Sequence, residues 1–328
     1  MGGQHSAPGT TATAVSAAVT RRITAWSVAT ATVLIALKAL ALWQSGSVAI
    51  LSSLADSSLD LVASLITFWA VRYAAAPPDA EHRFGHGKAE AVASLVQAAL
   101  VFASAALVGR EAIDRLMNPV AVTQGTWAVI VMAISIGLTG VLVSAQTRAL
   151  KQAGSVAVEG DRAHYFADLA GNAVALVGVG GAAWLGLPWL DAGAGLLVCL
   201  WLLWGAFGVL RSAADHLLDK GLVPEQQGRI LALARDDEAV IGVHQLRTRV
   251  SGPVVLIQMH MDLDPKLSLE AAHEIMLAAE DRILAEFPAA DILIHPDPRG
   301  RAGPHGGAFS ETADEHDEHA GHDHAHHS

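Results

Sequence analysis

Six long apolar segments constrain most strongly how this chain can fold. Each has about the 20 residues that an α-helix needs to cross the hydrocarbon core of a bilayer. The composition agrees, because 52% of the 328 residues are hydrophobic and only 16% are charged, whereas about 25% are charged in an average soluble domain. We therefore predict a six-helix transmembrane domain over residues 21–212. The six segments are approximately residues 23–43, 47–70, 91–113, 126–146, 163–185 and 189–210.

Lys and Arg residues indicate the orientation of these segments, since they accumulate in cytoplasmic loops. They gather at one set of segment ends, beginning with Arg21 and Arg72, whereas the opposite ends carry Arg110 and Arg115. This asymmetry predicts a multi-pass protein with both termini in the cytoplasm. Lys38 lies inside the first segment near its outer end. We expect its ammonium group to reach the interface, as long cationic side chains commonly do.

Two pairs of ionisable residues interrupt the second and fifth segments. Asp56 and Asp60 are four residues apart, as are His164 and Asp168, and this spacing places each pair on one helix face. Charged groups at membrane depth are costly and usually face a bundle interior or an ion path. We expect the two pairs to meet near the midplane and bind one cation. The alternatives are structural polar pairs between helices, or residues that lie at the interface.

The chemistry of this predicted site favours particular metals. An imidazole combined with carboxylates suits Zn²⁺ or Fe²⁺, whereas sites made of oxygen ligands alone suit Mg²⁺, Ca²⁺ or Mn²⁺. His164 therefore biases the site toward zinc, iron or cadmium. A second candidate cluster, Asp79, His82 and His86, lies in the polar loop after the second segment. Its alternative interpretation is a set of exposed loop histidines that bind no ligand.

After Arg211 the composition becomes that of a soluble domain. An order of helix, two strands, helix and strand in fewer than about 90 residues predicts a small α+β domain of the ferredoxin-like kind over residues 213–298. Residues 1–20 and the His/Asp/Glu-rich residues 299–328 are expected to be disordered, because neither segment can build a core. Five side chains of the soluble domain form a third candidate metal cluster, namely His244, His260, His273, His295 and Asp297.

The sequence also argues against other classes of protein. The single cysteine, Cys199, excludes a disulfide framework within one chain and a Cys-rich zinc motif. The formal net charge is −11 and no basic patch is present, so no nucleic-acid partner is expected.

The chain resembles the cation diffusion facilitator family, and within it the bacterial branch that exports ferrous iron and zinc. The resemblance covers about residues 20–298. The strings that carry it are Gly46-Ser47-Val48-Ala49-Ile50-Leu51, Asp56 through Asp60, Phe84-Gly85-His86-Gly87-Lys88-Ala89-Glu90, His164-Tyr165 with Asp168, and Leu246-Arg247-Thr248-Arg249 followed by Ser251-Gly252-Pro253.

The resemblance implies a role for each cluster. The four intramembrane ligands would form a tetrahedral transport site, the loop cluster a second metal site, and the soluble domain a binuclear zinc site at the interface of a homodimer. It also implies that a salt bridge between Lys88 and Asp219 holds this dimer together near the membrane surface. Pro296 departs from the family pattern, which has a polar residue there, so a ligand from that side chain is lost.

The implied activity is proton-coupled antiport that exports Zn²⁺ and/or Fe²⁺, with Cd²⁺ as a further substrate, across a bacterial inner membrane. A metal ligand must lose its proton to bind, so entering metal expels protons and incoming protons displace metal. The alternatives are a membrane metal sensor without transport and an intramembrane metalloenzyme. The sensor would leave the intramembrane charges unexplained. The enzyme is disfavoured because the only His-Glu pair, His273-Glu274, lacks a second histidine at the HExxH spacing.

Overall fold

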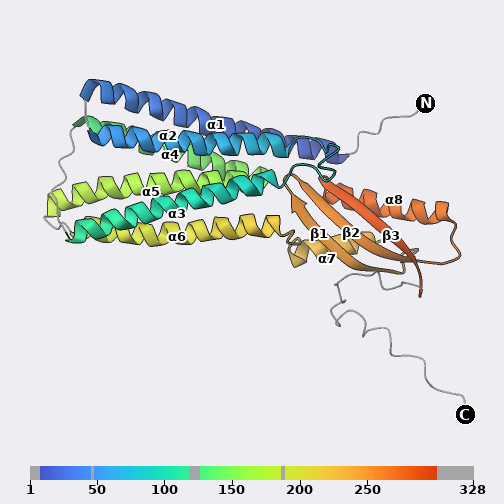
Figure 1. Cartoon of the computed structure of the whole chain (residues 1–328). Coiled ribbons are helices and arrows are strands. Elements are labelled where there is room, and N and C mark those ends of the chain that lie inside the picture. The colour runs from blue at the N-terminus through green and yellow to red at the C-terminus, as the bar shows by residue number, and fades with distance from the viewer. Residues whose placement is uncertain (1–7, 46–47, 118–125, 186–188, 301–328) are drawn as a thin grey trace, which may run out of the picture. The chain divides into compact units, whose positions relative to one another are not determined.

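The computed structural model describes residues 8–45, 48–117, 126–185 and 189–300. The chain divides into two compact units, one of residues 1–220 with 249–255 and the other of residues 221–248 with 256–328. The first unit contains a bundle of long helices (Figure 1). These helices are α1 (Pro8–Ser45), α2 (Val48–Ala74), α3 (Ala89–Met117), α4 (Thr126–Ala153), α5 (Val156–Leu185) and α6 (Trp189–Leu217).

The described helices agree with the predicted membrane-spanning class. Five of them, α1, α2, α3, α4 and α6, contain stretches that are long and apolar enough to cross a membrane. Helix α5 begins at Val156 rather than near Ala163, so its first half includes charged residues that the sequence places in a connection. These are Glu159, Asp161 and Arg162.

Helix α1 also begins earlier than expected, at Pro8, although the sequence predicts a disordered leader over residues 1–20. Contacts with α4 and α5 explain the longer helix. The Ser16 hydroxyl donates a hydrogen bond to the Ala153 carbonyl at 3.2 Å, and Val19 packs against a cluster that contains Ile23, Ala149 and Val158. Residues 1–7 and the His-rich segment 301–328 lie outside the described residues.

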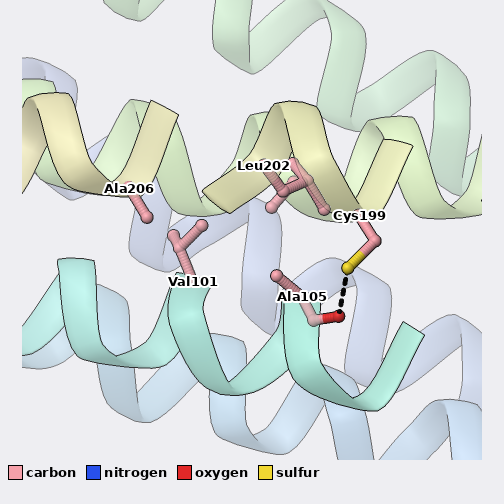
Figure 2. Packing of buried hydrophobic residues seen from close by; sticks show 6 residues of the cluster. Val101, Ala105, Cys199, Leu202 and Ala206 are labelled. Carbon is pink, nitrogen blue, oxygen red and sulfur yellow. Dashed lines mark hydrogen bonds between the residues drawn. The ribbon is translucent and has the colours of Figure 1, made fainter. Parts of the chain in front are cut away.

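Small side chains let α3 and α6 approach each other closely, as is common between membrane helices. A methyl group on Gly109 of α3 would lie only 2.8 Å from the Cys199 sulfur of α6. The Cys199 thiol donates a hydrogen bond to the Ala105 carbonyl at 3.1 Å (Figure 2). The lone cysteine therefore has a packing role. The labelled residues of this cluster are Val101, Ala105, Cys199, Leu202 and Ala206.

The second unit has the predicted order of helix, two strands, helix and strand. Pro224 occupies the first turn of α7, and the Ser268 hydroxyl caps α8 by accepting a hydrogen bond from the Ala271 N–H. The strands form one sheet in the order β1-β2-β3 (Figure 1). Ile230 and Ile283 of the two helices and Ile257 of β2 are fully buried. The elements are α7 (Pro224–Ala234), β1 (Gly242–Ser251), β2 (Val254–Leu263), α8 (Leu269–Glu286) and β3 (Ala290–Pro298).

Candidate metal centres

Helices α2 and α5 bring three of the predicted intramembrane ligands together. His164 Nε2 lies 3.2 Å from Asp60 Oδ1 and 3.7 Å from Asp168 Oδ2. The ligand atoms of the three residues all lie within 4.8 Å of one another. The His164 ring is buried, at 4% exposure. Two carboxylates and one imidazole within this distance could share one divalent cation, and a tetrahedral site would need one more ligand.

Asp56 is the fourth residue that the sequence assigns to this site. It lies on α2 one helical turn before Asp60, and its side chain is exposed. The group of ligand atoms within 4.8 Å does not include it. Its role as the fourth ligand therefore stays a prediction.

A buried carboxylate that the sequence analysis missed, Asp161, lies one turn before His164 on α5. Asp161 is 1% exposed. Its Oδ2 accepts hydrogen bonds from the Ser27 hydroxyl at 2.6 Å and the Gln146 amide at 2.8 Å, and its Oδ1 accepts one from Gln97 Nε2 at 3.3 Å. These bonds join α5 to α1, α4 and α3. The available signal was the spacing of positions 161, 164 and 168, which places all three on one helix face.

Hydrogen bonds from neighbouring helices extend this network. Gln97 Nε2 also donates to the Ala63 carbonyl at 3.0 Å and to the Thr67 hydroxyl at 2.8 Å, both on α2. The Tyr165 hydroxyl lies 2.7 Å from the Ser64 hydroxyl and donates to the Ser27 carbonyl at 3.2 Å. Such buried polar networks fix the relative positions of helices when their members are paired. The network therefore holds α5, and with it His164, in a defined rotation.

Lys38 differs from its predicted placement at the membrane interface. It is buried, at 6% exposure. Its ammonium group donates hydrogen bonds to the Ser57 hydroxyl at 2.6 Å and to the Ser53 carbonyl at 3.1 Å. The side chain therefore points from α1 toward α2, where two oxygen acceptors satisfy two of the three N–H donors of its ammonium group.

The loop between α2 and α3 forms the second group. The Asp79 carboxylate accepts hydrogen bonds from the backbone N–H groups of His82 at 2.6 Å and Glu81 at 2.9 Å, and its other oxygen lies 3.1 Å from His86 Nε2. The bond from the His82 N–H is the main reason why the pKa of Asp79 is lowered. His86 Nδ1 is buried without a hydrogen-bond partner among the described residues. Asp79, His82 and His86 have ligand atoms close enough to hold an ion.

The three strands of the second unit build the third group. His244 of β1, His260 of β2 and Asp297 of β3 form a further set of potential ligands. Asp297 Oδ2 lies 2.8 Å from His260 Nδ1 and 3.5 Å from His244 Nε2. Because neighbouring strands lie side by side, one residue from each strand is enough to assemble this cluster. The donor set of two imidazoles and one carboxylate fits zinc.

Other residues of the second unit lie near this group or apart from it. His295 Nε2 lies 3.6 Å from Asp297 Oδ1, although its side chain is largely exposed. Asp262, which the sequence analysis missed, lies 3.7 Å from His244 Nε2 and follows His260 by two residues on the same face of β2. His273 is exposed on α8 and is not a member of the described group. The ligand roles of His273 and His295 stay predictions.

Lys88 and Asp219, the predicted salt bridge, are paired within the chain at 3.1 Å. The structure adds Arg249, whose guanidinium lies 3.1 Å from the same oxygen of Asp219. Partial burial acts to raise the pKa of Asp219, but the hydrogen bonds and charges of Lys88 and Arg249 lower it overall. All three residues belong to the first unit. The contribution of this ion-pair group to a dimer stays a prediction.

Comparison with known proteins identifies the family of this chain. The model of the cation efflux transmembrane domain matches residues 24–218, and that of the cation efflux protein cytoplasmic domain matches residues 222–299. The cation-efflux pump FieF of Shewanella oneidensis is 42% identical over 272 residues, which cover 83% of this chain and 92% of that protein. FieF of Citrobacter koseri is 37% identical over 268 residues, covering 82% and 89%. The chain therefore belongs to the cation efflux family, or cation diffusion facilitators, and is a membrane transporter of cations rather than an enzyme.

Proposed function

We propose that this protein is a proton-coupled antiporter that exports Zn²⁺ and/or Fe²⁺, and also accepts Cd²⁺, from the cytoplasm. The single observation that carries the proposal is the group of Asp60, His164 and Asp168 on two membrane helices, with ligand atoms within 4.8 Å of one another. Intramembrane ionisable groups that converge in this way are typical of ion pathways. Membership of the cation efflux family supports the transport direction.

The ligand chemistry supports the choice of metal. A site of one imidazole and two or three carboxylates favours borderline metals such as zinc and ferrous iron over the hard cations Mg²⁺ and Ca²⁺. Cd²⁺ shares the charge of these ions and also binds imidazole. The relatives reported above carry the name cation-efflux pump, which agrees with export of a cation.

Proton coupling follows from the same ligands. His164 binds a metal only as neutral imidazole, and the carboxylates bind it only when ionised. Metal and protons therefore compete for the same side chains, so a proton gradient directed into the cell could drive metal out. Rocking of helices around a site near the midplane would expose these ligands to one side of the membrane at a time.

The proposal includes a dimer in a bacterial inner membrane, with both termini in the cytoplasm and lipid around the bundle. The distribution of Lys and Arg supports this orientation. The cytoplasmic-domain match over residues 222–299 supports assembly through the second unit, where the cluster at His244, His260 and Asp297 would hold zinc and favour the assembled state. Lys88 and Asp219 would support the same dimer.

The test is metal flux into proteoliposomes that contain a dye sensitive to internal pH. We expect Zn²⁺ and Fe²⁺ to move with opposite proton flow in the wild type, and Asp60→Ala to abolish both movements while the protein remains folded. Asp236→Ala, which makes the same change at an exposed position of the second unit, is the matched control and should transport normally. Unaltered flux in Asp60→Ala would refute the site. Tight zinc binding without flux in the wild type would favour a metal sensor.

A further inference from the structure

The buried ammonium group of Lys38 is a charge that the three metal clusters leave unexplained. Burying a charged group is costly unless other groups compensate for it. Lys38 of α1 is 6% exposed and donates hydrogen bonds to Ser57 Oγ and Ser53 O of α2 at 2.6 and 3.1 Å. Ser57 is itself fully buried and is the residue after Asp56. The ammonium group is therefore held against the part of α2 that carries the acidic residues.

The partners of Lys38 are neutral oxygens, so the positive charge is left to act on carboxylates beyond them. Asp60, Asp56 and Asp168 lie close enough to Lys38 to interact with it electrostatically. Asp60 and Asp168 belong to the group of potential metal ligands. Charge interactions of a buried ammonium group extend over several ångströms, because the low polarity of its surroundings screens them weakly. Lys38 therefore shares the electrostatic environment of the transport site without occupying a ligand position.

The formal charges of the site show how Lys38 affects its net charge when a metal is bound. The three carboxylates of the predicted ligand set, Asp56, Asp60 and Asp168, carry a formal charge of −3 when ionised, and the ammonium group of Lys38 adds +1, which leaves −2. Asp161 is not counted, because it is not a predicted ligand and accepts its own hydrogen bonds from Ser27, Gln146 and Gln97. One divalent cation then neutralises the site. Without Lys38, a divalent cation would leave a residual charge of −1 among buried groups, and the metal would be held more strongly. A transporter must bind its ion firmly enough to load it and weakly enough to release it.

We propose that Lys38 is a resident counter-cation of the transport site, which matches the site to a charge of +2 and limits its affinity so that metal can leave. This inference rests on the proposed transport function and deepens it. Lys38 acts through the charge of the site and is a positioning residue rather than a ligand. Ser57 and Ser53 serve as its anchor, since they hold the ammonium group on α2 beside Asp56.

The experiment measures zinc flux into proteoliposomes of the full-length protein as a function of zinc concentration. Lys38→Gln removes the charge but keeps a hydrogen-bond donor. We expect it to lower the half-saturating zinc concentration about tenfold, because one unit of charge is lost near the metal, and to lower the maximal rate as release slows. Lys38→Arg keeps the charge and should change the half-saturating concentration by less than about threefold.

Ser57→Ala separates the charge of Lys38 from its hydrogen bond. It removes one anchor but keeps the ammonium group, so its half-saturating concentration should stay close to that of the wild type. The inference is overturned if Lys38→Gln matches the wild type, or if Lys38→Arg, which keeps the charge, reproduces the effect of Lys38→Gln. Lys38→Met, a second neutral variant, is measured in parallel. If Lys38→Gln does not fold, the half-saturating zinc concentration of Lys38→Met decides the result. Absence of flux in the wild type would instead refute the proposed function, which keeps the two failures distinguishable.

Discussion

Replacement of Asp161 by alanine tests whether the buried network, rather than the apolar surface alone, holds α5 in place. Ser27 Oγ and Gln146 Nε2 donate to Asp161 Oδ2 at 2.6 and 2.8 Å. Hydrogen bonds to a charged acceptor contribute about 1.5–3 kcal/mol each. Gln97 keeps two acceptors on α2, so its bond adds little to the loss. Relief from burying a carboxylate offsets part of the cost, and we expect Asp161→Ala to lose about 2 kcal/mol.

The assay is thermal unfolding of the purified protein in detergent, followed by tryptophan fluorescence. A loss of about 2 kcal/mol corresponds to a decrease of roughly 4–8 °C in melting temperature for a cooperative unit of the size of the first one. Asp161→Asn is the matched control, since it keeps the size and one acceptor oxygen, and it should lose about half as much. If Asp161→Ala melts within about 1 °C of the wild type, the reasoning is refuted, because the desolvation of the carboxylate would then cancel its hydrogen bonds.

Further substitutions test the packing, the ion-pair group and the metal clusters. A methyl group in Gly87→Ala would overlap the β1–β2 turn and lie 2.6 Å from the Gly252 nitrogen, so melting temperature should fall by several degrees, and an unchanged value would contradict this close packing. The pKa of Asp219 is lowered in the folded protein. The contribution of its ionised carboxylate to folding stability is therefore complete above the ordinary carboxyl pKa of about 3.9, and it is lost only as the pH falls through the lowered pKa. Asp219→Asn should therefore lower the melting temperature equally at pH 7 and pH 5, and convergence at pH 5 would contradict the assignment. His164→Asp replaces imidazole with a hard oxygen ligand and should broaden transport toward Mn²⁺, whereas an unaltered metal profile in the flux assay would count against His164 as the selectivity element. Zinc should raise the melting temperature of the wild type more than that of His260→Ala, and equal shifts would argue against zinc at the strand cluster.

Periodic features of the sequence were sufficient to predict the fold. Apolar segments of about 20 residues predict membrane helices, and alternating or helical patterns predict the order of elements in the second unit. The pairs at positions 56 and 60 and at 164 and 168 were identifiable because charge is rare in such segments. The early starts of α1 at Pro8 and α5 at Val156 were not predicted. Polar residues that pack against other helices look like loop residues when only the local sequence is considered.

Residues whose roles depend on contacts distant in the chain were harder to identify. Asp161 belongs with Gln97 and Gln146 only after three helices pack together. Arg249 of β1 joins the ion-pair group although it lies 30 residues from Asp219 along the chain. Lys38 was expected to extend toward the interface because that is the usual behaviour of a lysine near a helix end. The acceptors on α2 that keep it buried become neighbours only when α1 and α2 form a hairpin.

The buried polar residues around the transport site are arranged asymmetrically along the helices. Asp161 and Gln97 lie on one side of His164, toward the end of the bundle that holds the α5 N-terminus and the α2 C-terminus. There Gln97 also donates hydrogen bonds to Ala63 and Thr67 of α2. These residues are almost fully buried, whereas Asp56, on the opposite side of the ligands along α2, is exposed. Buried hydrogen bonds therefore join α2, α3 and α5 on the side of the ligands that faces the α5 N-terminus. Asp161, Gln97 and Thr67, which make these bonds, are all almost fully buried, so the network that positions His164 also excludes solvent from that side of the ligands.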